Sequence, residues 1–273
     1  MTLAIAGIRK FRTRSATIVS LVIAVILVAA LIMLEGVAYA SARTQNGADT
    51  TQLAWFLTFP GAFDAVLTFI FAFFGLIALI YVATAAGSEW SWGTLKVAVA
   101  RGQSRWGYTI ATFASLAIVL LIGMLITYAA GLVAVFIGAS IAGLSVGNPA
   151  DPPTLARIGV ELARCWIGLL GLTSLAYAVA MVAKSQMAGI GTVIGYYLVS
   201  LIGPALLPDF VKDIFRYLPF NVAGDAIGLQ PPPGTGPNPS TLDPNLALLV
   251  DVLWLVGCLT VAAVSVQRTE ITG

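Results

Sequence analysis

The sequence predicts an all-α, polytopic integral membrane protein with six transmembrane helices. Of its 273 residues, 59% are hydrophobic and only 10% are charged, against roughly a quarter in an ordinary soluble domain. The charged residues are clustered, and they leave neutral runs at 15–34, 65–88, 106–150, 165–183, 185–208 and 252–267. Most of these runs reach the ~20 residues that a helix needs to cross ~30 Å of hydrocarbon. A conventional water-soluble fold is therefore excluded.

The segment before the first apolar run sets the expected direction of the chain. It carries four basic side chains, Arg9, Lys10, Arg12 and Arg14. By the positive-inside rule, residues 1–14 form a cytoplasmic basic helix. The tripeptide Ala38-Tyr39-Ala40 resembles a site of signal-peptide cleavage. The apolar run at 15–34 is nevertheless longer than the ~7–15 residues usual in a signal peptide, which favours a retained helix at about 15–39.

A second helix at about 61–86 returns the chain to the cytoplasm. The loop that follows, 87–105, is rich in basic residues, with Lys96, Arg101 and Arg105 against the single acid Glu89. The next neutral stretch, 106–150, would make ~68 Å of straight helix, so one long helix projects past the membrane or two short ones lie within it. Breakers gather at its far end, namely Gly138, Gly143, Gly147, Asn148 and Pro149. Their position favours one span with an external extension.

Three further helices are predicted at about 162–182, 186–207 and 246–266. They alternate in direction, so both termini are cytoplasmic and residues 1–273 form one transmembrane domain in the cell membrane. The inside segments then hold nine of the 14 basic residues, at positions 9, 10, 12, 14, 96, 101, 105, 184 and 268. The fifth helix contains Gly189, Gly191 and Gly195. Small residues let helix backbones approach closely, so this helix is the predicted dimer seam.

The external loop at 208–245 has two parts. Its first part is an amphipathic helix at 209–218, whose apolar face includes Phe210, Ile214 and Phe215. Two interpretations stay open: these three side chains form an external gate near a substrate exit, or the helix only covers a loop. The second part, PPPGTGPNP, is extended by its prolines and is expected to be a stiff spacer.

The sequence lacks the residues that most enzymes and metal sites need. It has no histidine, and its two cysteines, Cys165 and Cys258, lie in apolar runs as small buried hydrophobic residues. No lysine follows a GxxxxGK[ST] pattern, so no loop of this chain is expected to bind ATP. We therefore predict no catalytic residue, no metal site and no cofactor in this chain. The net charge of +2 gives no case for a nucleic-acid partner.

Acidic residues near the membrane are the remaining candidates for polar chemistry. Glu35, Asp64 and Asp251 fall near the predicted outer ends of their helices, where water is expected to solvate them or where they line an outer vestibule. Glu161 and Arg164 are three residues apart and are expected to pair along one helix. No charge is firmly placed at mid-membrane, which weakens the interpretation as a proton-coupled or sodium-coupled carrier.

The most informative segment is the loop G-S-E-W-S-W-G-T-L-K-V-A-V-A-R-G-Q-S-R-W-G-Y at 87–108. It resembles the first cytoplasmic loop of ABC-2 type transporter permeases, especially their bacitracin-resistance-like branch. The matching residues are Gly87, Glu89, Gly93, Thr94, Leu95, Lys96, Gly102, Ser104, Arg105 and Tyr108. The basic N-terminal helix, the six spans and the amphipathic element before the last span are also similar to that family. Relatives often carry an acid in the N-terminal helix, whereas residues 1–14 have none.

The resemblance implies a permease of an ATP-driven exporter. The loop would be a coupling helix that docks on a separate cytoplasmic ATPase subunit, which binds ATP and Mg, with two permeases and two ATPases in a complex among membrane lipids. The coupling residues would be Glu89, Trp90, Trp92, Gly93, Thr94, Leu95, Lys96, Arg101, Gly102 and Arg105. Glu89 and Arg105 would contact either the ATPase or the chain's own N-terminal helix.

Two other classes of function also fit an apolar helical bundle. A stand-alone carrier or channel would need no partner, and a non-transporting scaffold or sensor subunit would bind a partner and move nothing. A membrane enzyme fits least, because no clustered carboxylates or positioned thiols are visible. The sequence does not choose the cargo, the direction of transport, or a homodimer over a heterodimer.

Overall fold

The computed structural model describes residues 2–44, 50–206, 214–233 and 241–269, and it confirms the predicted all-α class. Helices account for 84% of the described residues, and those residues contain no strand. In chain order the elements are α1 (Thr2–Arg12), α2 (Ser15–Ala42), α3 (Thr51–Leu57), α4 (Gly61–Phe69), the π-helical η1 (Ile70–Phe74), α5 (Gly75–Ser91), α6 (Thr94–Ala100), α7 (Arg105–Ala142), α8 (Pro152–Ala183), α9 (Gln186–Leu206), α11 (Pro219–Ile227) and α12 (Pro244–Arg268).

Five helical segments within the described ranges are long and apolar enough to cross a membrane. They are Ser15–Ala42, Gly61–Ser91, Arg105–Ala142, Pro152–Ala183 and Pro244–Arg268. These segments indicate a multi-pass membrane protein. α7 answers the question left open at 106–150, because it is one unbroken helix of 38 residues, or ~57 Å. It ends where Gly143 takes a positive φ of 66°, a conformation that glycine adopts without strain.

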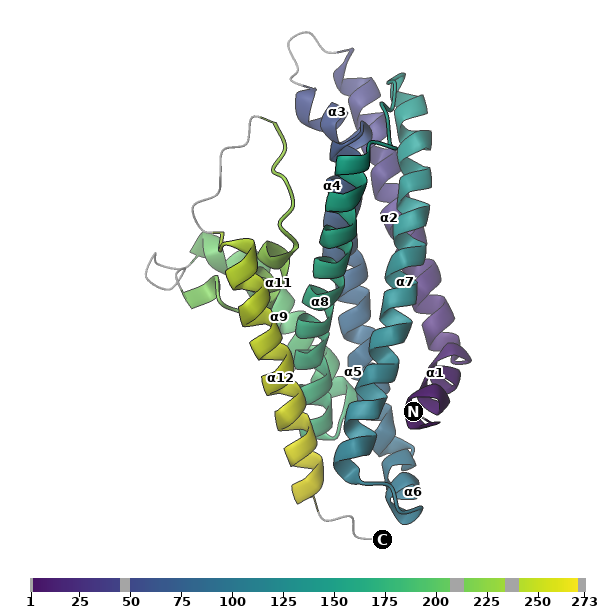
Figure 1. Cartoon of the computed structure of the whole chain (residues 1–273), viewed down its shortest axis with the longest axis vertical. Helices are drawn as coiled ribbons and strands as arrows, with labels where there is room; N and C mark the ends of the chain where they lie inside the picture. The colour runs from purple at the N-terminus through teal and green to yellow at the C-terminus, as the bar shows by residue number, and fades with distance from the viewer. Residues whose placement is uncertain (1, 45–49, 207–213, 234–240, 270–273) are drawn as a thin grey trace.

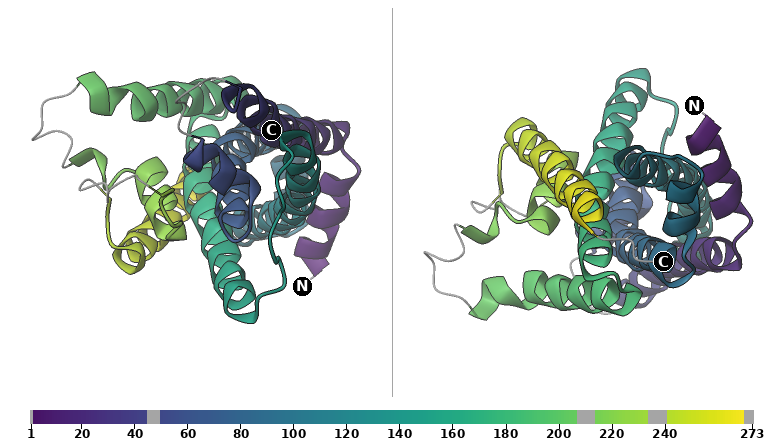
Figure 2. Two further views of the ribbon diagram at one scale, coloured as in Figure 1. Left: turned by 90° about the horizontal axis from the view of Figure 1, so that it is seen from above. Right: turned by 90° about the horizontal axis from the view of Figure 1, so that it is seen from below.

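The helices form an elongated bundle with two different ends (Figure 1). We call the end that carries α1, α6 and the last turn of α12 the basal end, and the end that carries α3 the apical end. α2 packs on α7, α12 packs on α8 and α11, and α5 packs on α8 and α9. α2, α7 and α8 extend further toward the apical end than α9, α11 and α12 do. α9 lies at the side of the bundle and projects away from it in both end-on views (Figure 2).

Two glycines bring α2 and α7 into backbone contact. A Cβ atom at Gly36 would overlap the carbonyl group of Gly138, and a Cβ at Gly138 would lie 3.1 Å from the carbonyl oxygen of Ile32. The expectation that Gly138 helps to end the third helix is therefore wrong, because it lies inside α7 at this crossing. The breaker that does act is Gly143. The glycines of the fifth helix were singled out from the sequence for close packing, whereas this pair was not.

The structure corrects the expected environment of three acids. Asp64 and Asp251 are 1% and 0% exposed, so water does not solvate them as predicted. Asp64 accepts two hydrogen bonds from Arg157, at 3.2 and 3.0 Å. Glu161 pairs with this arginine at 3.1 Å instead of with Arg164, because Arg157 lies one helical turn before it on the same face of α8. The ion pair between Asp64 of α4 and Arg157 of α8 is therefore expected to stabilise the fold only when both side chains are charged.

We expect Asp64→Asn to lower the free energy of unfolding by about 2–3 kcal/mol, because it leaves the half-buried Arg157 guanidinium with one acid in place of two. The thermal midpoint in detergent, with a ligand-free sample at fixed lipid content, measures this loss. Asp151→Asn is the matched control, since Asp151 is an exposed N-cap of α8. Its loss should stay within about 1 kcal/mol. Equal midpoints for the two variants would contradict the structural role of the buried pair.

The loop predicted at 208–245 contains a helix that the sequence reasoning missed. α11 begins at Pro219 and is followed by Gly228, whose φ is +74°, the usual pairing of proline at the start and glycine after the end. Its buried side chains pack on α8 and α12, and Asp225 accepts a hydrogen bond from the Leu242 amide at 2.9 Å. Burial raises the pKa of the Asp225 carboxyl, and this hydrogen bond partly offsets the effect.

The predicted amphipathic helix at 209–218 is only partly visible. Phe210 lies outside the described residues. Ile214 and Phe215 are helical; Ile214 is 63% exposed and Phe215 is half-buried. The external gate thus stays a prediction.

Candidate functional site

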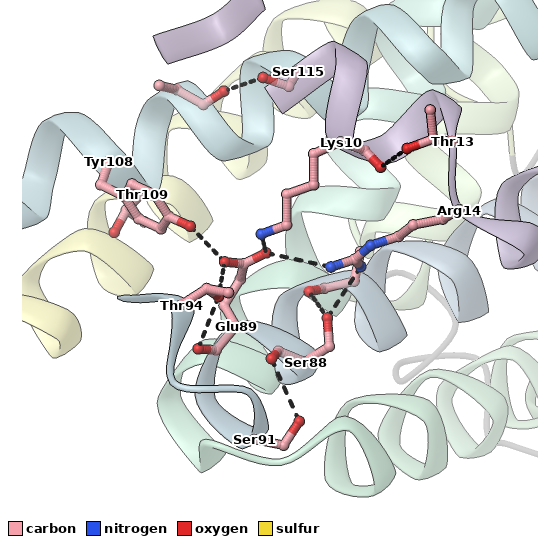
Figure 3. Close-up of polar contacts among 12 residues, drawn as sticks. Lys10, Thr13, Arg14, Ser88, Glu89, Ser91, Thr94, Tyr108, Thr109 and Ser115 are labelled. Atoms are coloured by element: carbon pink, nitrogen blue, oxygen red, sulfur yellow. Dashed lines mark hydrogen bonds and ion pairs between the residues drawn. The ribbon is translucent and has the colours of Figure 1, made fainter. Parts of the chain in front are cut away.

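The basal cluster forms around one buried acid at the end of α5. Glu89 is 0% exposed, and its Oε1 atom lies 2.5 Å from the Nζ of Lys10 on α1. The guanidinium of Arg14, just before α2, is 3.9 Å from the same oxygen. Arg14 also donates a hydrogen bond to the hydroxyl of Ser88 at 3.1 Å. Figure 3 shows these cations converging on the carboxylate from the N-terminal segment.

The other carboxylate oxygen of Glu89 is bound from two further elements. Its Oε2 atom accepts hydrogen bonds from the hydroxyls of Thr94 on α6 and Tyr108 on α7, each at 2.5 Å (Figure 3). A buried carboxylate is costly unless charged and hydrogen-bonding partners surround it, and here both oxygens have such partners. One side chain therefore joins α1, α5, α6 and α7.

Glycines and a serine shape the loop that surrounds this acid. Gly93 and Gly102 have φ values of +66° and +81°, and they turn the chain before and after α6. Ser104 caps α7 by accepting a hydrogen bond from the Gly107 amide at 3.1 Å. Gly87 lies against the backbone of Gln186, where a Cβ atom would overlap the start of α9. Most residues that carry the sequence resemblance thus build the loop itself.

Arg105 connects the loop to the C-terminal helix. Its guanidinium donates hydrogen bonds to the carbonyl oxygens of Thr269 at 2.6 Å and Gln267 at 3.1 Å. These carbonyls belong to the end of α12, where a cation is electrostatically favoured. Of the two predicted kinds of contact, Glu89 makes the one to the N-terminal helix, and Arg105 binds the other end of the chain.

The remaining predicted residues divide into buried and exposed ones. Leu95 is 1% exposed, and Trp90 is half-buried, with the Nζ of Lys184 5.3 Å from its ring centroid. Among the exposed side chains of the loop and the first turn of α7 are five that we call the docking face: Trp92, Lys96, Val97, Arg101 and Trp106. Three of them are large and apolar, with exposures of 65% for Trp92, 51% for Val97 and 40% for Trp106. Aromatic and arginine side chains, here Trp92, Trp106 and Arg101, are enriched at protein interfaces.

A comparison with protein families identifies the relatives of the chain. The family described as "Protein of unknown function (DUF2705)" matches residues 17–272, which is nearly the whole sequence. The chain belongs to the DUF2705 family. None of the curated proteins matches it. The match covers α2 to α12, so the DUF2705 region includes Glu89 and the docking face but begins after Lys10 and Arg14.

Sequence reasoning missed part of the site of this DUF2705 protein. Lys10 and Arg14 entered the prediction only as signals of membrane orientation, and Ser88 and Tyr108 were not among the predicted coupling residues. Tyr108 could have been found, since it belongs to the matched pattern and lies one helical turn inside α7. The partnership of Lys10 with Glu89 carries no local signal, because the two residues are 79 positions apart.

The predicted dimer-seam glycines lie in two different environments. A Cβ atom at Gly189 would contact Ala180 and Ala83, so this glycine packs α9 against α8 and α5 within the chain. Around Gly191 and Gly195 there is open space. The latter two therefore lie on a face of α9 that the described part of the chain leaves uncovered.

Proposed function

We propose that this chain is the membrane permease subunit of an ABC-2 type exporter, driven by ATP hydrolysis in a separate subunit. The observation that carries the proposal is the basal cluster, in which Glu89 joins four elements behind an exposed docking face. A coupling element must be rigid behind the surface that the partner contacts, or a push on it is lost in local bending. The network of two cations and two hydroxyls on Glu89 meets this requirement.

The proposal includes six membrane crossings, with α9 as the sixth. α9 covers Gln186–Leu206, and 21 residues make ~31 Å of helix, enough to cross ~30 Å of hydrocarbon. α8 ends at Lys184 near the basal end, and α12 runs toward that end, so the chain must return between them (Figure 1). The basal position of both α1 and the end of α12 supports an even number of crossings. The basic residues of α1 and the loop support a cytoplasmic basal end and a cell-membrane location.

In this mechanism the basal cluster moves as one unit. ATP binding would close two partner subunits, displace the docking face, and carry α5 and α7 with it through Glu89. The nucleotide shifts the equilibrium between the inward and outward arrangements of α2, α5 and α9. The size of that shift is set by how much better the ATP-bound ATPase binds one arrangement than the other. ATP and Mg remain on the partner, and a second permease copy would meet α9 at Gly191 and Gly195, beside the exposed Ile194 and Leu198.

Charge reversal on the docking face tests the proposal. We expect Arg101→Glu to weaken co-purification with a candidate ABC ATPase by about tenfold, and to remove its stimulated ATP hydrolysis. Arg43→Glu is the control, since Arg43 is also an exposed arginine but follows α2 at the apical end. If Arg101→Glu behaves like Arg43→Glu in both assays, the docking face is assigned wrongly. Cargo flux into liposomes that contain this chain alone would instead favour a stand-alone carrier.

A further inference from the structure

Another buried acid lies in the membrane-crossing part of the chain, far from the basal cluster. Asp251 is on α12, seven residues after Pro244, which is ~10 Å into the helix. It is 0% exposed, and neither of its carboxyl oxygens has a hydrogen-bond partner. Asp64 and Glu89, the comparable buried acids, each have a cation within 3.0 Å. Asp251 is therefore unlike the other buried acids of the bundle.

The Asp251 carboxyl packs against a glycine on the neighbouring helix. A Cβ atom at Gly171 on α8 would overlap the Asp251 carboxyl, so any other residue there would displace it. The nearby hydroxyl of Ser174 donates to the Gly171 carbonyl at 2.6 Å and is occupied by that bond. Ala247, one turn before Asp251 on α12, is fully buried. The carboxyl thus points into an apolar contact between α8 and α12.

The charged groups of α8 and α11 are bound elsewhere. On α8, Arg157 and Glu161 pair with each other, and Arg164 donates to the side chain of Asn245 at 2.7 Å. On α11, the Asp225 carboxylate accepts from a backbone amide. None of these groups makes an ion pair with Asp251.

The charged groups of α7 and of α12 itself are also bound elsewhere or lie far along the helix. The charged residue of α7, Arg105, donates its hydrogen bonds to the carbonyl oxygens of Gln267 and Thr269. On α12, Asp243 caps the helix, and Arg268 lies at the opposite end. In the segment before α11, the Arg216 guanidinium lies 5.1 Å from the ring centroid of Tyr217. The backbone carbonyl oxygen of Tyr217 accepts a hydrogen bond from the Trp254 indole at 3.0 Å. The described part of the chain supplies no cation to Asp251.

We propose that Asp251 is a proton-binding site within the membrane. A carboxylate ion without partners in an apolar contact is far less stable than the neutral acid, so the closed contact between α8 and α12 holds the protonated form. When the contact opens to water, the carboxyl O–H bond ionises and the proton passes to water. An open apolar groove of about 560 Å³ follows the same seam toward the basal end, lined by Leu175, Ala178, Trp254 and Cys258 among others. This inference does not depend on an ATPase partner.

Carbodiimide labelling of the purified full-length chain tests the proposal. Dicyclohexylcarbodiimide reacts with protonated carboxyls in apolar surroundings, whereas an ordinary aspartate is ionised above about pH 4. At about pH 7 we expect Asp251 to be labelled at least tenfold more than Asp243, an exposed carboxylate eight residues earlier on the same chain segment. Mass spectrometry of the peptide that contains both residues measures the ratio. Asp251→Asn should remove the label.

Three labelling results would overturn the proposal. The first is equal labelling of Asp251 and Asp243, and the second is no labelling of Asp251 at any pH between about 5 and 8. The third is loss of the label on adding sodium or potassium, which would assign the site to a metal cation. Stability gives an independent readout, because asparagine resembles the neutral acid in shape. We expect the wild-type thermal midpoint to fall as pH rises from about 6 to 9, and the Asp251→Asn midpoint to change less. Parallel pH curves would contradict a proton on Asp251.

Discussion

Glu89→Ala is expected to release α1 from the bundle and to disable the basal cluster. The substitution removes the acid from two cations and takes the carboxylate acceptor from the half-buried hydroxyls of Thr94 and Tyr108. Breaking a buried ion pair from one side typically costs about 3–5 kcal/mol. Lys10 is 30% exposed and can regain water, so we expect about 3 kcal/mol. Hydrogen exchange of the α1 amides should then accelerate by about 100-fold, since each 1.4 kcal/mol is a factor of ten.

Glu35→Ala controls for the loss of an acid from a membrane helix. Glu35 is half-buried on α2, and no hydrogen bond or ion pair is found for it in the structure's described ranges. In the Glu35→Ala variant, hydrogen exchange of the α1 amides should match that of the wild type. Glu89→Gln separates charge from shape, because the amide keeps one acceptor for the hydroxyls and loses the attraction for Lys10. Its effect should lie between those of wild type and Glu89→Ala. Unchanged α1 exchange in Glu89→Ala would show that α1 is held by its packing on α7 alone.

The helices were largely predictable because the membrane imposes a simple rule on composition. In lipid, a run of about 20 apolar residues can satisfy its backbone N–H and C=O groups only as a helix. The helices at 15–39, 61–86 and 246–266 therefore follow from hydropathy. The apical extension of α8 was not predicted, because residues 152–161 are more polar and do not belong to an uncharged apolar run. α11 was missed for a related reason: at nine residues it is too short for hydropathy, and only its proline and glycine mark it.

The site was predictable in position but not in its contacts. The glycines, Glu89 and Arg105 could be singled out because they lie in one continuous loop with a recognisable pattern. Which side chains turn inward could not be read, because that depends on where α1 and the end of α12 lie in space. The burial of Asp251 could not be read from the sequence either. Its place near a helix end predicted contact with water, whereas its carboxyl packs against Gly171 of α8 and the residue is 0% exposed.

Gly36→Leu is expected to be among the most destabilising substitutions in the bundle. The first side-chain atom already overlaps the carbonyl group of Gly138, and a backbone atom cannot rotate away as a flexible side chain could. α2 must then move off α7, which opens the contacts of Ile32 and Leu57 beside the crossing. Overpacking a tight core costs about 1–3 kcal/mol, and we expect the upper part of this range. The thermal midpoint of the purified protein in detergent measures it.

Gly257→Leu gives the comparison that isolates this contact from helix propensity. Leucine favours a helix over glycine by up to about 1 kcal/mol, and both positions lie inside long apolar helices, so propensity alone would stabilise both variants. A Cβ atom at Gly257 would meet no other atom within 4 Å, so its variant should be neutral or more stable. Opposite signs in the two variants can then arise only from the crossing of α2 and α7. Because α7 carries Tyr108 into the basal cluster, the same crossing would pass any motion of that cluster to α2.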